Sequence, residues 1–165
     1  MSSPTPETSN LITRLAQTPE RISDSTSQLS PEAVRSKPSA EEFSVLEHVC
    51  HLRDLEIEAY GYRIDRMLEA ENPSLPDFDG AGTAIARVYN SQDFASALAG
   101  FTRARMQNVQ TLSRLNDSQL DRAGDLPPIG RITIKNLMQM MHDHDEDHLH
   151  EMQITIGRFH RHAQD

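Results

Sequence analysis

Apolar residues recur at spacings of three and four along most of this chain, the pattern of helices that bury one face. No stretch alternates between apolar and polar residues for long enough to predict a strand. The pattern therefore predicts an all-α protein, a bundle of four long helices at about residues 11–29, 44–71, 92–115 and 133 onward. The Thr18-Pro19-Glu20 sequence predicts a break or a second start in the first helix, because proline lacks a backbone N–H.

Local signals mark the helix ends and the connections. Ser44 and Glu47 have the spacing of a capping box, and Thr133 precedes the last apolar run as an N-cap. Residues 1–9 are rich in Ser, Thr and Pro, so we expect a flexible tail before one domain over residues 10–165. Segment 72–90 contains Pro and Gly, which predicts a long connection between the second and third helices with a helical turn near residues 85–88.

The second long helix carries apolar residues on two sides, which predicts a place in the middle of a bundle. His51, Leu55 and Tyr62 form the shorter stripe, so His51 is expected to face the interior. The longer stripe consists of Phe43, Leu46, Val49, Cys50, Ile57, Tyr60, Ile64 and Leu68. Arg105 falls among the inward positions of the third helix. We interpret it as structural, either reaching solvent or pairing with a buried carboxylate.

Four of the eight histidines lie within nine residues of the last helix, at positions 142, 144, 148 and 150. His144 and His148 are one helical turn apart and fall within the apolar stripe that includes Met141 and Met152. Buried imidazoles need a partner. Two at this spacing favour a metal ion over histidines held by hydrogen bonds alone. Such a site needs about three protein ligands, and periodicity alone does not decide whether His48 or His51 supplies the third.

The other histidines and the acidic residues near them are weaker candidates for a functional site because of their expected positions. His48, His142 and His150 are expected at exposed or marginal positions. The acidic residues Asp143, Glu146 and Glu151 are expected on a solvated helix face. His160 and His162 belong to a terminal R-F-H-R-H segment and are given no catalytic role.

The composition narrows the classes of function. The 165-residue chain has a formal net charge of −9, which argues against nucleic-acid binding and against an anionic membrane surface. We find no signal-peptide pattern and no apolar run of transmembrane length. Cys50 is the single cysteine, which excludes an internal disulfide and favours a reducing, cytoplasmic setting. We expect its thiol to be a small core group and not a nucleophile.

Two motifs resemble the DinB/YfiT-like superfamily of four-helix metalloenzymes, and the resemblance covers nearly the whole chain. The last-helix pattern of that family, H-x-x-x-H-L, is present as His144, His148 and Leu149. Its second-helix pattern, W-S-x-x-E-x-x-x-H-L-x-D, is matched here by Phe43, Ser44, Glu47, His51, Leu52 and Asp54. The usual tryptophan is thus a phenylalanine, which affects packing more than chemistry.

The resemblance implies that His51, His144 and His148 bind a divalent transition metal, zinc by default, with nickel, iron and manganese as alternatives. It implies a thiol S-transferase or a hydrolase that activates a low-molecular-weight thiol or a water against a small-molecule substrate. Asp54 or Asp147 is expected to orient a ligand ring.

Other readings remain open from the sequence. One alternative is a metal-binding or stress-associated bundle without turnover, and another is a bundle whose histidines only form hydrogen bonds. The resemblance and the long apolar helices favour a homodimer, with neither nucleic acid nor membrane as a partner.

Overall fold

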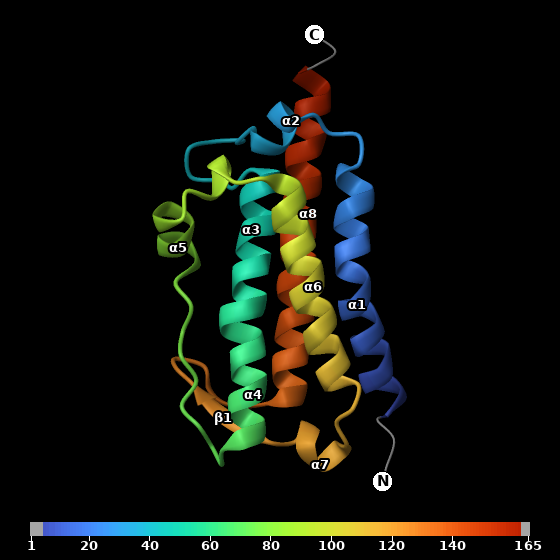
Figure 1. Ribbon diagram of the computed structural model, residues 1–165, viewed down its shortest axis with the longest axis vertical. Helices are drawn as coiled ribbons and strands as arrows, with labels where there is room; N and C mark the ends of the chain where they lie inside the picture. The colour runs from blue at the N-terminus through green and yellow to red at the C-terminus, as the bar shows by residue number, and fades with distance from the viewer. Residues whose placement is uncertain (1–4, 163–165) are drawn as a thin grey trace.

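Four long helices run side by side in the computed structural model, which describes residues 5–162 without the side chains of His160 and His162 (Figure 1). They are α1 (Pro6–Thr26), the continuous segment of α3 (Val45–Leu55), η1 (Glu56–Gly61) and α4 (Tyr62–Glu69), then α6 (Phe94–Leu112) and α8 (Ile134–His162). Both α1 and α3 pack against α6 and α8. The predicted four-helix bundle is confirmed.

Short elements connect these helices. They are α2 (Pro31–Arg35), α5 (Gly80–Ala86), η2 (Tyr89–Ser91), α7 (Asp117–Leu120), and the antiparallel strands β1 (Ala123–Leu126) and β2 (Gly130–Thr133). The β-hairpin was not predicted from the sequence. Each strand has only four residues, too few for a period-two pattern to stand out. No helix in the described range is long and apolar enough to span a membrane.

The predicted caps are present. Ser44 accepts a hydrogen bond from the Glu47 backbone while the Glu47 carboxylate accepts one from the Ser44 backbone, which starts α3. The Thr133 hydroxyl accepts a hydrogen bond from the Asn136 backbone at 3.1 Å and starts α8. Helix α1 begins at Pro6, after an N-cap at Thr5, so it includes residues expected in the flexible tail. Residues 1–4 of that tail lie outside the described range.

Helix α1 continues unbroken through Pro19, in contrast to the expected break. Proline at this position cannot donate to the carbonyl oxygen of Leu15, four residues earlier. Arg105 on α6 donates to that oxygen instead, at 3.1 Å. A side chain from a neighbouring helix therefore replaces the hydrogen bond that proline removes.

The second long helix contains a π-helical turn, η1, that the periodicity analysis did not predict. A π turn has more residues than an α turn, so it rotates the faces that follow it. Ile57, which lies within the turn, and Tyr62, which follows it, were both assigned to buried stripes and are 52% and 47% exposed.

A layer of buried polar residues crosses the bundle at one level. Arg105 is fully buried and pairs with Asp145 on α8 at 2.5 Å and with Glu56 in η1 at 2.8 Å. The Thr18 hydroxyl donates to Asp145 at 2.7 Å. Burial alone lowers the pKa of Arg105, but Glu56 and Asp145 raise it above its ordinary value. Of the two alternatives for Arg105, the structure shows the buried cation with carboxylate partners.

We expect Arg105→Met to lower the free energy of unfolding by about 3–5 kcal/mol, because it leaves two buried carboxyl groups without their guanidinium. Urea unfolding followed by circular dichroism measures the change. Arg103→Met on the exposed face of the same helix is the matched control, expected to change stability by no more than about 0.5 kcal/mol. Equal effects of the two substitutions would contradict a central role for Arg105.

Candidate metal centre

Three histidine side chains converge between α3 and α8. The Nε2 atom of His144 lies 3.4 Å from Nε2 of His51 and 3.1 Å from Nε2 of His148. One nitrogen of each ring lies within 4.8 Å of the other two. Ligands at about 2.0–2.1 Å from a tetrahedral zinc ion are about 3.4 Å apart, so these spacings suit three ligands of one ion.

The helices present these rings for local reasons. His51 lies in the second turn of α3, whose start is fixed by the capping box at Ser44. His144 and His148 are one turn apart on α8 and therefore share a face. Their neighbour Asp145 points to Arg105, which fixes the rotation of α8, and His144 is directed about 100° away from it.

The electrostatics of the cluster favour neutral imidazoles. Burial, together with nearby His144, lowers the pKa of His51 to about 4. Burial and the three surrounding histidines lower the pKa of His148 to about 2. Burial also lowers the pKa of His144, against the opposing effect of Asp145 and Asp147. Neutral rings keep a nitrogen lone pair, which is what a transition metal binds.

The polar atoms of the cluster are incompletely satisfied. The Nδ1 atoms of His51 and His144 are buried and have no hydrogen-bond partner among the described residues. The Nε2 atom of His144 contacts the Nε2 atoms of both His51 and His148. Buried polar atoms normally have a partner. One nitrogen of a neutral imidazole either donates or accepts, so hydrogen bonds alone cannot join Nε2 of His144 to both of the other Nε2 atoms in the same way. A metal ion between the three Nε2 atoms would give each of them a partner and leave the ring protons on the Nδ1 atoms, so the residues present fit the metal that the family resemblance implies.

Packing fixes the ring of His51. Gly80 begins α5, and a Cβ at this position would lie 2.5 Å from Cε1 of His51, too close unless the His51 ring shifts. The rings of Phe43 and Phe78 lie 5.8 Å and 6.1 Å from the His51 ring. The connection between the second and third long helices thus packs against His51 of the candidate metal centre.

Some candidates lie elsewhere. Asp54 is buried, but its carboxylate accepts hydrogen bonds from Arg53, Arg87 and Tyr89 and contacts no ligand ring. Asp147 is exposed, as is His150. The expectation that either aspartate orients a ligand ring is therefore unsupported by contacts. His142 is partly buried and lies 3.9 Å from Glu146, outside the cluster.

Cys50 is buried, as expected, and burial raises the pKa of its thiol to about 11. Its sulfur faces the carbonyl oxygen of Tyr89 at 3.9 Å and the side chain of Gln92 at 3.6 Å, away from the histidine cluster. A buried thiol with a raised pKa is a poor nucleophile, because the thiolate is the reactive form.

His48 differs most from its expected position. It is 3% exposed, and its Nδ1 atom lies 2.8 Å from Nδ1 of the candidate ligand His148. The Glu151 carboxylate lies 3.7 Å from the first of these nitrogens and 3.5 Å from the second. The spacing of His48 and His51, three residues apart on one helix, was the signal that both could face the same neighbour.

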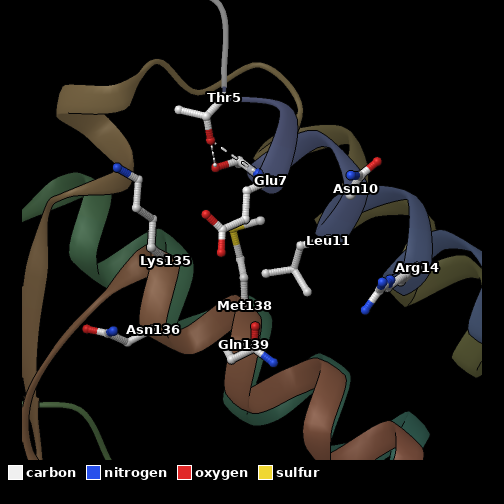
Figure 2. A pocket seen from close by; sticks show the side chains of 10 residues that line it. Thr5, Glu7, Asn10, Leu11, Arg14, Lys135, Asn136, Met138 and Gln139 are labelled. Atoms are coloured by element: carbon white, nitrogen blue, oxygen red, sulfur yellow. Dashed lines mark hydrogen bonds between the residues drawn. The ribbon is translucent and has the colours of Figure 1, made fainter.

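Two cavities differ in their relation to the histidines. One of about 440 Å³ has both His48 and His148 in its wall. Another, of about 740 Å³, lies between the first turns of α1 and α8 and is lined by Glu7, Arg14 and Lys135 among others (Figure 2). No histidine among the described residues lines the second cavity.

The fold and the histidine cluster define a four-helix bundle with a candidate metal centre. The model of the DinB superfamily matches residues 14–152, and the chain belongs to that superfamily. The chain is also similar in structure to YfiT from Bacillus subtilis, which is described as a probable metal-dependent hydrolase with an unusual four-helix bundle topology. The two share 19% sequence identity with a TM-score of 0.86, over 96% of this chain and 91% of YfiT. No curated protein matches the sequence.

We expect Gly80→Ala to weaken zinc binding, because the added methyl group would displace the His51 ring. Competition with a chromophoric chelator measures the affinity. Gly157→Ala on α8 is the control, since its Cβ would meet only Arg161 Nη1 at an ordinary 3.7 Å. Equal zinc affinity in both variants would show that the close approach of Gly80 does not hold His51.

Proposed function

We propose that this protein binds one divalent transition metal through His51, His144 and His148 and acts as a metal-dependent hydrolase on a small molecule. The observation that carries the proposal is the convergence of three largely buried Nε2 atoms at 3.1 Å and 3.4 Å. A metal held by three imidazoles with an open position lowers the pKa of a bound water or holds a thiolate at neutral pH. Zinc is the default metal, and nickel, iron and manganese are compatible with the same ligands.

In this proposal the nucleophile comes from outside the chain. Cys50 is the only cysteine, and its thiol is buried with a raised pKa. This leaves a water or a low-molecular-weight thiol. The description of YfiT as a probable metal-dependent hydrolase supports water as the first choice. S-transfer from an external thiol is the second, and it uses the same metal site.

The cavity of about 440 Å³ supports a small-molecule substrate, because His148 lies in its wall. Phe43, Ala81 and Ile154 supply apolar surface, while Glu151 and Arg158 supply charge. In this proposal the cavity binds and orients the substrate next to the metal, and the three imidazoles stay neutral and hold the ion. A homodimer and a cytoplasmic location stay predictions from the sequence.

The first experiment is elemental analysis of the purified, untagged protein. We expect about one equivalent of a transition metal in the wild type and none in His144→Ala, because two remaining imidazoles hold such an ion weakly. His150→Ala, an exposed histidine on the same helix, is the matched control and should keep the metal. A wild type that binds no metal after incubation with zinc or nickel would rule out the proposal.

A second experiment separates the reactions. We expect the zinc-loaded protein to hydrolyse para-nitrophenyl acetate without added thiol, at least about a hundredfold faster than His144→Ala, since the metal generates the nucleophile. Removal of the metal by a chelator should abolish the activity and zinc should restore it.

The controls define the other outcomes of this assay. Turnover only of monochlorobimane, and only in the presence of glutathione or free cysteine, would identify a thiol S-transferase. Metal binding without either activity would favour the bundle that binds metal without turnover.

A further inference from the structure

The three candidate ligands differ in what holds their second ring nitrogen. The Nδ1 atoms of His51 and His144 have no hydrogen-bond partner among the described residues. The Nδ1 atom of His148 lies 2.8 Å from Nδ1 of His48, which is a hydrogen-bond distance. His148 is thus the one candidate ligand in the described range whose ring is held by a hydrogen bond opposite its metal-facing nitrogen.

The chemistry of imidazole fixes the direction of this hydrogen bond. If Nε2 of His148 gives its lone pair to a metal, the proton of the neutral ring must lie on Nδ1. This N–H then donates to Nδ1 of His48, which accepts with its own lone pair. His48 must therefore carry its proton on Nε2. The contact selects one tautomer on each ring.

His48 is well placed to play this part. It lies one helical turn before His51 on α3, so it approaches His148 from the same helix as the third ligand. Its ring is 3% exposed and packs edge-on against Phe43 at 5.5 Å between ring centroids. The Glu151 carboxylate, the other group near Nδ1 of His148, is 3.5 Å away and largely exposed. Of the two groups near Nδ1 of His148, the buried His48 ring therefore makes the shorter contact and the exposed Glu151 carboxylate the longer one.

We propose that His48 is a positioning residue that holds the His148 ring with Nε2 toward the metal and thereby sets the metal affinity of the centre. The proposal rests on the three-histidine centre proposed above. His148 lies in the wall of the cavity of about 440 Å³ and its side chain is 13% exposed, so a directional contact adds to the packing of the neighbouring rings. Without His48, the Nδ1 proton of His148 is left to Glu151 or to solvent.

The test is the zinc affinity of wild type, His48→Ala and His48→Gln, measured by competition with a chromophoric chelator. We expect His48→Ala to bind zinc about 10–100-fold more weakly, the usual effect of removing a partner of a ligating histidine. His48→Gln should recover most of the affinity, because its amide oxygen can accept the Nδ1 proton. Thermal unfolding of each metal-free variant checks that it folds.

Glu151→Gln is the matched control. It alters the neighbouring carboxylate and should change the affinity by less than about threefold, a shift well below the effect expected for a ligand's hydrogen-bond partner. A cobalt-substituted wild type and His48→Gln should have the same visible spectrum, and His48→Ala a changed one, because the orientation of a ligand ring alters the ligand field.

Two results would overturn the positioning role. One is wild-type zinc affinity in His48→Ala, with the metal still lost in His144→Ala; the three-histidine centre would stand without this partner. The other is two equivalents of zinc in the wild type, one of them lost in both His48→Ala and Glu151→Gln. His48, His148 and Glu151 would then form a second cation site, for which their spacing also suffices. A wild type without any metal would instead overturn the proposed function itself.

Discussion

The buried ion pairs of Arg105 determine how the four helices fit together. The guanidinium contacts the Leu15 carbonyl of α1, Glu56 in η1 and Asp145 of α8, all from its place on α6. On α6 and α8, Arg105 and Asp145 fall between two apolar clusters of the core. A charge in such a layer is tolerated only where every partner is in place. The layer therefore specifies one rotation and one height for each helix, which apolar packing alone specifies less strictly.

The candidate metal centre depends on this layer. Asp145 and His144 are adjacent, so the rotation that brings Asp145 to Arg105 also brings His144 and His148 toward α3. Glu56 lies five residues after His51 and ties the same helix to Arg105. The proline in α1 belongs to the same arrangement, since the carbonyl it leaves free accepts from Arg105. Pro19, which the sequence alone marks as a helix break, thus creates a point of contact between α1 and α6.

Most of the fold could be predicted because its signals are local. The capping box at Ser44, the cap at Thr133 and the spacing of His144 and His148 each lie within a single turn, so the sequence displays them directly. The β-hairpin and the π turn could not be read in this way. Four-residue strands depend on pairing with each other, and a π turn changes the periodicity from which faces are inferred. The close approach of Gly80 to His51 joins residues 29 apart and was equally hidden.

The difference between local and long-range signals also explains which histidines could be assigned from the sequence. Periodicity placed His144 and His148 on one face, and family resemblance was needed to choose His51, because His48 and His51 face the same neighbour. In the structure, packing orients the ring of His51, and a hydrogen bond orients the ring of His148. Gly80 and two phenylalanines enclose His51, where a ring has little freedom. His148 borders a cavity and packs against the other histidine rings, and a directional contact adds to this packing. The histidine that the sequence left as a secondary candidate supplies that contact at 2.8 Å.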